Sequence, residues 1–327
     1  MAADRIRALV VTSIGGPEVL QVQELQAPEP AAGEVVIDVA AAGVNFIDVY
    51  QRTGIYPMQP PFTLGGECAG IVSAVGAGVS EFAVGEVVAT ADARGAMAGK
   101  VAVPAEGVVA VPDDVSPEQA AAVMLQGMTA HYLVTSLYDV KPWDEVLVHA
   151  AAGGVGQLLV QLCKARGAHV VATVGTPAKE EIARSLGADE VIRYDEVDDL
   201  AAAVRAASGG GVHVAYDGVG KATFDASLAS LRRRGIMALF GAASGAVPPV
   251  DPQRLNSGGS LFLTRPTLKH YTASPDELRW RAGEILSAVG SGEVKVEIGG
   301  TYPLDRAADA YRALEGRRTT GKLLLVP

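Results

Sequence analysis

The segment with the clearest chemical signature is Ala151-Ala152-Gly153-Gly154-Val155-Gly156, which follows the apolar run EVLVH and precedes the run QLLVQLCKA. This order reads as a strand, a tight turn and a helix. Small residues in such a turn let the backbone approach a pyrophosphate, while the helix N-terminus offers unpaired N–H groups and a positive dipole end. The pattern is an AxGxxG form of the dinucleotide fingerprint. It predicts a dinucleotide site; the alternative is a close-packed turn that binds nothing.

The next predicted strand, HVVATV, indicates which dinucleotide would fit. Sites that bind NAD place Asp or Glu about 20 residues beyond the glycines, against the ribose 2′-hydroxyl. Here the strand ends in Gly175 and Thr176 without a carboxylate, and Lys179 follows within one helical turn. Because a lysine attracts a 2′-phosphate and a carboxylate repels it, we expect NADPH rather than NADH. Taken alone, Lys179 would be interpreted as a solvated helix lysine; the missing carboxylate at the same place favours the phosphate.

Histidine and cysteine are too sparse near the N-terminus for a metal site. No histidine precedes His131, and Cys68 is the one cysteine in the predicted first domain. A catalytic zinc ion needs about three protein ligands. We therefore expect no metal. His149 and His213 fall in predicted strands, where core packing or hydrogen bonding at a strand end is their expected role.

The elements that must position the glycine-rich turn form an alternating series. Strands are expected at EVLVHA, HVVATV, VIRY, VHVAYD, GIMALFG and SLFLT, with helices over 155–167, 177–186, 197–207 and 221–231. Such alternation requires crossover connections, which give a parallel sheet with helices on both faces. The sequence predicts a doubly wound α/β domain of the Rossmann type. The basic run Arg232-Arg233-Arg234 is expected to be a solvated turn.

The first 115 or so residues have a different texture. Short apolar runs broken by Gly and Pro predict a partly open, antiparallel β-barrel. Ser116-Pro117-Glu118-Gln119 then carries the signals of a helix start, and a helix is expected from 118 to about 138. The residues after 264 are expected to return to the first domain. The predicted domains are 1–124 with 265–327, and 125–264.

Composition excludes several classes of protein. The chain has 327 residues, 49% of them hydrophobic, so it can form a sizeable core. Its net charge of −10 makes a nucleic-acid partner unexpected, since phosphates would repel it. No run is apolar enough for a bilayer span or a signal peptide, and two cysteines cannot form a disulfide framework. We expect a cytoplasmic protein without membrane insertion.

Ten segments, in order along nearly the whole chain, then share a pattern. They are GGPEVL, AAGVNFIDVYQRTGIYP, GGECAGIVSAVG, LQGMTAHYL, HAAAGGVG, TVGTPAK, YDGVG, RRRGIMALFG, LTRPTL and RRTTGKLLLVP. Together they resemble the zinc-free medium-chain dehydrogenases/reductases, in the NADPH:quinone oxidoreductase (ζ-crystallin-like) branch. The resemblance implies a Rossmann domain inserted into a GroES-like catalytic domain, hydride transfer from NADPH to a quinone, and a homodimer that pairs sheet edges around residues 255–263.

The resemblance also implies site residues in the first domain. Asn45, Asp48, Tyr50 and Tyr56 would be the catalytic or acceptor-orienting positions, with Phe46 and Ile47 beside the nicotinamide. A plainer interpretation is also open: Asn45 could cap a short helix, with Asp48 and Tyr50 solvated on its surface, and Tyr56 could anchor a loop.

The cofactor-binding residues that the resemblance implies are spread over the rest of the chain. Those near the nicotinamide would be Thr129, Tyr132, Gly218, Phe240, Gly241, Ala242, Leu263, Thr264 and Arg265. Gly153, Gly154, Val155 and Gly156 would take the pyrophosphate, and Gly175, Thr176, Lys179 and Tyr194 the 2′-phosphate. Arg317 and Lys322 would reach the phosphates from the C-terminal segment.

Two departures from the family pattern affect the choice of acceptor. Gly66 stands where metal-dependent relatives carry a zinc-binding histidine, and the loop 93–101 is altered, with Met97 near a position that is commonly aromatic. The same scaffold could instead reduce the double bond of an enone or 2-alkenal, with Tyr50 or Tyr56 as proton donor. A third possibility is a non-catalytic, crystallin-like protein that only binds NADPH.

Overall fold

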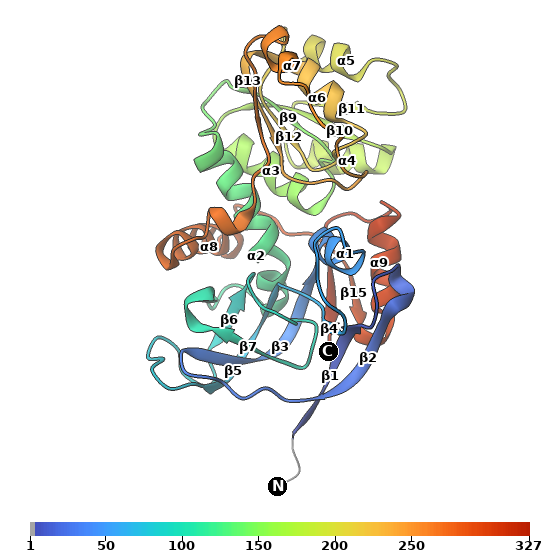
Figure 1. Ribbon diagram of the computed structural model, residues 1–327. Helices are drawn as coiled ribbons and strands as arrows, with labels where there is room; N and C mark the ends of the chain where they lie inside the picture. The colour runs from blue at the N-terminus through green and yellow to red at the C-terminus, as the bar shows by residue number, and fades with distance from the viewer. Residues whose placement is uncertain (1–3) are drawn as a thin grey trace. The chain divides into compact units, whose positions relative to one another are not determined.

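The computed structural model describes residues 4–327, which form two compact units (Figure 1). Unit 1 holds the chain up to Leu125 together with Ser274–Pro327, and unit 2 holds Gln126–Ala273. The chain returns to unit 1 at Ser274, nine residues beyond the predicted return at residue 265. The residues between belong to unit 2, where the ring of Tyr271 stacks on that of Tyr132 with centroids 4.2 Å apart.

Unit 1 is built on two sheets. The smaller has the order β2 (Leu20–Gln26), β1 (Arg5–Val11), β4 (Phe62–Thr63). In the larger, the long strand β3 (Glu34–Val44) pairs antiparallel with β5 (Cys68–Val75), β7 (Lys100–Pro104) and β16 (Lys322–Val326). Strands β6 (Val87–Thr90) and β8 (Val108–Ala110) extend one side, and β15 (Ile298–Pro303) extends the other. The predicted β-rich, GroES-like domain is confirmed.

Two helices begin at a serine followed by a proline, the signal read from the sequence at Ser116. Ser116 and Gln119 form a reciprocal cap ahead of α2 (Pro117–Tyr132), with N···O distances of 3.0 and 3.2 Å. Ser274 Oγ accepts the N–H of Glu277 in α8 (Pro275–Gly290). The remaining helices are α1 (Phe46–Arg52), α9 (Ala307–Glu315) and the 3₁₀ turns η1 (Pro17–Val19), η2 (Ala105–Gly107) and η5 (Leu304–Arg306).

Unit 2 contains the six-stranded parallel sheet that the alternating pattern predicts. Its order is β11 (Glu190–Arg193), β10 (His169–Val174), β9 (Glu145–Val148), β12 (Val212–Asp217), β13 (Leu231–Leu239), β14 (Phe262–Thr264). The strands are apolar because helices cover both faces. By the right-handed crossover rule, α3 (Gly154–Ala165) and α4 (Pro177–Ser185) lie on one face, and α5 (Leu200–Ala207) and α6 (Phe224–Ser230) on the other (Figure 1). Also in this unit are α7 (Gln253–Ser257), the π-helical turn η3 (Leu133–Leu137) and η4 (Leu268–His270).

The expected turn at Arg232-Arg233-Arg234 is wrong. These residues lie within β13, and their side chains are exposed, as predicted for a solvated segment. The pairing of β13 with β12 is interrupted between Leu231 and Ile236, and Arg234 has a φ of 59°. A bulge therefore accommodates the basic run without ending the strand.

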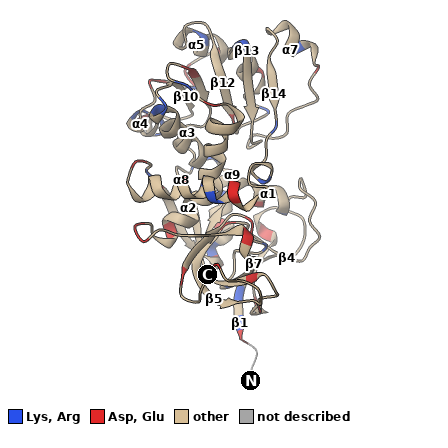
Figure 2. Cartoon of the chain, turned by 90° about the vertical axis from the view of Figure 1, so that its left-hand side faces the viewer, with Lys and Arg blue, Asp and Glu red and all other residues tan. Residues whose placement is uncertain are grey.

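Charges are mixed along the chain, as Figure 2 shows, with Lys and Arg interspersed among Asp and Glu. Within residues 4–327, no helix combines the length and the apolar character that crossing a bilayer requires.

Candidate functional site

The predicted cofactor residues of unit 2 gather at one edge of its sheet. Gly153–Gly156 follow β9, Gly175 and Thr176 follow β10, and Tyr194 follows β11. On the other side, Gly218 follows β12, Phe240–Ala242 follow β13, and Thr264 ends β14. Because all six strands are parallel, these positions share the carboxyl edge, which is where open α/β sheets bind their ligands.

The glycine-rich turn is tightly packed at Gly156, against backbone, and at Gly154, against a side chain. A Cβ on Gly156 would lie 2.3 Å from the carbonyl oxygen of Ala150, and a Cβ on Gly154 would lie 1.9 Å from Gln126 Oε1. Gly153 is the N-cap of α3, and no side chain caps the helix there. The first N–H groups of α3 have no intrahelical acceptor, so this N-terminus can receive a pyrophosphate.

The end of β10 suits a 2′-phosphate. Gly175 and Thr176 are exposed, and Thr176 Oγ1 caps α4 by accepting the N–H of Lys179 at 3.3 Å. Two carboxylates in this region are engaged by arginines: Glu180 by Arg184, and Asp195 by Arg193. A lysine beside an exposed strand end that carries no carboxylate fits a 2′-phosphate better than a bare ribose hydroxyl.

The ends of β12 and β13 approach each other closely. A Cβ on Gly218 would lie 2.8 Å from the ring of Phe240, and a Cβ on Gly241 would lie 2.5 Å from the carbonyl oxygen of Gly218. The N–H of Phe240 donates to the Asp217 carbonyl at 2.9 Å. Glycine at both positions thus allows the segments after β12 and β13 to pack closely. No side chain projects from Gly218 or Gly241, so a cofactor could approach the backbone there.

Most of the other predicted nicotinamide contacts of unit 2 have buried or half-buried side chains. Tyr132 is almost wholly buried, because its ring stacks on Tyr271, and Thr129 is buried too. Leu263 and Thr264 are half-buried on the edge strand β14, and Arg265 is exposed. Their contact with a cofactor stays a prediction.

In unit 1, Lys322 has a structural role. Its Nζ lies 2.5 Å from Glu67 Oε2 and 2.6 Å from Asn45 Oδ1, and its side chain is 1% exposed. Asn45 Nδ2 also donates to Glu67 Oε2, and Glu67 Oε1 accepts the N–H of Leu125. The prediction that Lys322 reaches a cofactor phosphate is therefore wrong, since a buried ion pair holds its ammonium. Arg317, in contrast, is exposed.

Asn45 and Asp48 fix the start of α1. Asp48 Oδ2 accepts the backbone N–H of Asn45 at 2.8 Å and the hydroxyl of Tyr311 at 2.9 Å. Asp48 is fully buried, and its Oδ1 has no hydrogen-bond partner. Burial raises the pKa of Asp48 to about 7. The capping interpretation of Asn45 is confirmed, and the alternative of a solvated Asp48 is wrong.

Three aromatic residues of the predicted acceptor region lie side by side. The rings of Phe46 and Tyr50 have centroids 6.3 Å apart, and Tyr56 meets Tyr50 edge-on at 5.4 Å. Tyr50 is half-buried, whereas Tyr56 and Ile47 are exposed. This arrangement offers an aromatic surface with one accessible phenol.

Across residues 4–327, no three His, Cys, Asp or Glu side chains are grouped so that they could hold a metal ion. Glu67 follows Gly66, the position where metal-dependent relatives carry a histidine ligand, and its carboxylate is paired with Lys322. The residues present do not fit a catalytic zinc ion.

Sequence reasoning missed the buried polar residues behind these positions. Thr173 and Asp217 are polar residues near the carboxyl ends of mainly apolar strands, which is a usable signal. Nothing local marks Tyr311 as a partner of Asp48, since 263 residues separate them.

Comparison with known proteins agrees with this architecture. Residues 31–113 match the family model "Alcohol dehydrogenase GroES-like domain", and residues 154–281 match "Zinc-binding dehydrogenase". Quinone oxidoreductase 1 of Escherichia coli is 44% identical over 318 residues, covering 96% of this chain and 97% of that protein. The 2-haloacrylate reductase of a Burkholderia species is 40% identical, with 98% and 99% covered.

A solved structure extends this likeness to three dimensions. A mycobacterial protein complexed with NADPH has 49% sequence identity and a TM-score of 0.96, covering 98% of this chain and 100% of that one. Identity at this level over nearly the full length, together with the glycine-rich turn and the paired Glu67, shows the family. The chain belongs to the zinc-free quinone oxidoreductase family of the medium-chain dehydrogenases/reductases.

Proposed function

We propose that this protein is an NADPH-dependent quinone oxidoreductase that works without a metal ion. The observation that carries the proposal is the carboxyl edge of the unit 2 sheet, where a glycine-rich turn opens α3 and β10 ends beside Lys179 without a carboxylate. Support also comes from relatives named quinone oxidoreductases and from a related structure solved with NADPH.

In this proposal, the residues of the protein bind NADPH, orient it and shield it from water. NADPH, when bound, supplies the hydride. The N-terminus of α3, at Gly154 and Val155, would hold the pyrophosphate, and Lys179 with Tyr194 would hold the 2′-phosphate. Gly218 and Gly241 would leave space for the cofactor, with Phe240 packed against them.

Unit 1 would supply the acceptor surface. A quinone is flat and electron-poor, so it would stack on the aromatic residues Phe46, Tyr50 and Tyr56. Its reduced oxyanion is stabilised by conjugation and needs little help from an acid. Asn45 and Asp48 would then act by fixing α1 rather than by touching the acceptor.

The test is consumption of NADPH by purified protein in the presence of 1,4-benzoquinone, followed by the loss of reduced-nicotinamide absorbance. A rate well above the uncatalysed background is expected. No rate above background, with NADPH still bound, would overturn the proposal and favour a non-catalytic binding protein.

A second candidate is reduction of an activated carbon–carbon double bond. The likeness to a 2-haloacrylate reductase favours it, as does the exposed phenol of Tyr56, which could donate the proton that such a reduction needs. An acceptor panel in which enones or haloacrylates exceed quinones in kcat/KM would support this candidate.

We also propose a homodimer, located in the cytoplasm. Strand β14 is an edge of the unit 2 sheet that pairs with β13 on one side, and Phe262 on it is 58% exposed. An unpaired edge with an exposed aromatic favours association between copies. Light scattering after size-exclusion chromatography is expected to give the mass of a dimer, and a monomer mass would refute this.

A further inference from the structure

Four neighbouring strands of unit 2 each end near a polar side chain, and these side chains form one hydrogen-bonded chain. Tyr194 follows β11, Thr173 is the second-last residue of β10, His149 follows β9, and Asp217 ends β12. Ser227 of α6 completes the set. All but Tyr194 are at most 1% exposed. The hydrogen-bonded chain of side chains is therefore buried beneath the carboxyl edge of the sheet, and it reaches solvent at Tyr194.

His149 stands in the middle of this chain. Its Nε2 lies 2.9 Å from Ser227 Oγ, and its Nδ1 lies 2.7 Å from Thr173 Oγ1. Thr173 Oγ1 is 2.7 Å from the Tyr194 hydroxyl, which itself lies 3.4 Å from His149 Nδ1. The rings of His149 and Tyr194 are nearly parallel, at 12°, with centroids 6.2 Å apart.

The inner end of the chain is anchored at Asp217. Its Oδ1 accepts the N–H groups of Val219 and Gly220, and Thr223 donates its hydroxyl to the same carboxylate. Ser227 Oγ donates to Asp217 Oδ2 at 2.6 Å. A carboxylate that accepts this many donors is a rigid support, and the turn it holds includes Gly218.

The donors assign the state of the His149 ring. The proton of Ser227 is used on Asp217, so Ser227 Oγ receives the Nε2–H of His149. Burial lowers the pKa of His149, which favours the neutral ring. Nδ1 is then an acceptor turned toward the hydroxyls of Thr173 and Tyr194.

We propose that His149 is a positioning residue that holds Tyr194 for recognition of the 2′-phosphate of NADPH. The proposal rests on the proposed function, in which Tyr194 and Lys179 surround that phosphate. Tyr194 follows β11, the edge strand of the sheet, so strand pairing supports it from one side alone. The anchored chain through Thr173 and His149 supplies the second support.

The consequence is a selective effect. Loss of the His149 ring removes the group that fixes Thr173 Oγ1 at 2.7 Å and one of the partners of the Tyr194 hydroxyl, so Thr173 alone would hold that hydroxyl less firmly. The glycine-rich turn and Lys179 stay in place. Affinity for NADPH should fall, while affinity for NADH, which has no 2′-phosphate, should hold. A general packing defect would weaken both cofactors alike.

The experiment measures Kd for NADPH and for NADH by fluorescence titration, without acceptor, in wild type, His149→Leu and Tyr194→Phe. Each variant is expected to lose about 5- to 10-fold in NADPH affinity, as for one lost hydrogen bond, with NADH changed less than about 2-fold. The double variant should lose no more than Tyr194→Phe alone, because both act through one hydroxyl. His149→Asn, whose side-chain oxygen can replace the Nδ1 acceptor, should recover part of the loss.

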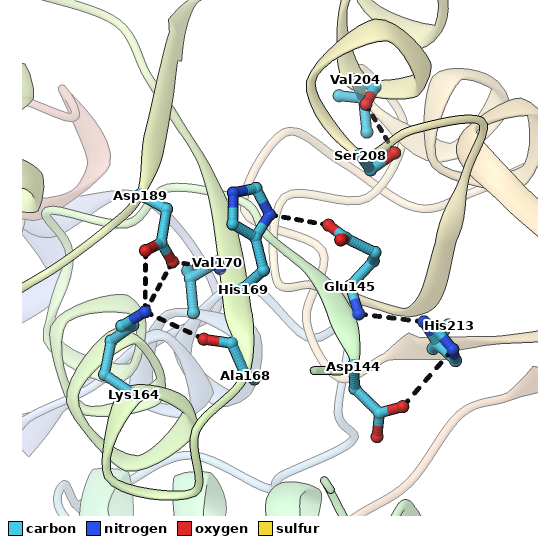
Figure 3. Close-up of polar contacts among 10 residues, drawn as sticks. All are labelled: Asp144, Glu145, Lys164, Ala168, His169, Val170, Asp189, Val204, Ser208 and His213. Atoms are coloured by element: carbon cyan, nitrogen blue, oxygen red, sulfur yellow. Dashed lines mark hydrogen bonds and ion pairs between the residues drawn. The ribbon is translucent and has the colours of Figure 1, made fainter. Parts of the chain in front are cut away.

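The matched control is His213, which lies near the amino ends of the strands of the same sheet (Figure 3). There His213 Nδ1 accepts the N–H of Glu145 at 2.9 Å, and its Nε2 lies 3.4 Å from Asp144 Oδ1. His213→Leu removes a strand-borne histidine far from the carboxyl edge. It should leave the NADPH-to-NADH affinity ratio unchanged.

The outcomes separate this inference from the proposed function. If wild type binds both cofactors equally, the proposed cofactor choice fails, and this inference with it. If wild type prefers NADPH and His149→Leu keeps the same preference, or weakens both cofactors alike, the inference alone fails. Should His149→Leu not fold, Thr173→Val tests the same link, and an unchanged ratio there overturns it.

Discussion

Lys322 and Glu67 form an ion pair in the interior of unit 1, with Nζ and Oε2 2.5 Å apart and neither side chain more than 1% exposed. The pair ties the C-terminal strand β16 to the segment just before β5, and it holds Asn45 at the start of α1. A lysine near the C-terminus thus stabilises the unit that we propose carries the acceptor surface.

Removing one partner of this pair should be costly. Lys322→Met would leave Glu67 buried and uncompensated, so we expect a loss of about 3–5 kcal/mol in unfolding free energy. Lys322→Met with Glu67→Leu should recover much of that loss. Urea unfolding of the three chains checks this, and a Lys322→Met variant as stable as wild type would contradict the ion-pair role.

Lys179 should determine cofactor choice. Lys179→Ala removes the charge beside the end of β10 while the Thr176 cap, which uses a backbone N–H, stays. We expect about a 10- to 100-fold rise in KM for NADPH, the value of a charged hydrogen bond, and little change for NADH. Lys164→Ala is the control, because that lysine pairs with Asp189 at the opposite edge (Figure 3). Equal effects on both cofactors would contradict the assignment.

Asp48 should make stability depend on pH. Its folded pKa, about 7, lies above the ordinary value of 3.8 because the carboxyl is buried. The folded state therefore binds the proton more tightly, and the stabilisation is present at low pH and lost as pH rises through about 7. Asp48→Asn, which stays neutral, should gain stability relative to wild type between pH 5 and pH 8. Urea unfolding at pH 5 and pH 8 tests this. If the difference in unfolding free energy between Asp48→Asn and wild type is the same at both pH values, the raised pKa is contradicted.

Tyr56 should distinguish the two candidate reactions. Its phenol is accessible and its ring packs edge-on against Tyr50. Tyr56→Phe keeps the ring, so quinone reduction should change less than about 2-fold, while reduction of an enone that needs a proton donor should fall by about 100-fold. Tyr50→Phe tests the other candidate donor, whose phenol is half-buried, and should leave enone reduction unchanged if Tyr56 is the donor. A large loss toward quinones in Tyr56→Phe would show that quinone reduction also requires the phenol.

Local patterns predicted much of this molecule. The strand, glycine turn and helix around Gly153–Gly156 form a contiguous segment, and the cap at Ser116 is a four-residue signal. The run at Arg232-Arg233-Arg234 misled because a bulge, set by pairing with β12, keeps a polar stretch inside a strand.

The sequence did not predict contacts between residues that lie far apart along the chain. Lys322 lies 255 residues from Glu67, and Asp48 lies 263 from Tyr311, so only the folded sheet brings them together. The expectation that His149 packs in the core or bonds at a strand end is confirmed, because its ring is buried and hydrogen-bonded directly after β9. Its partners are Thr173, Ser227 and Tyr194. They meet His149 because of the order of the parallel strands, and a single sequence does not reveal these pairings.

The most direct test of the central claim is the initial rate of 1,4-benzoquinone reduction by the purified protein with NADPH and, in parallel, with NADH. The account predicts rapid loss of reduced nicotinamide with NADPH and a much lower kcat/KM with NADH. Equal rates with the two cofactors would contradict the 2′-phosphate site at Lys179 and Tyr194. No loss above background with either cofactor would contradict the assignment as a quinone oxidoreductase.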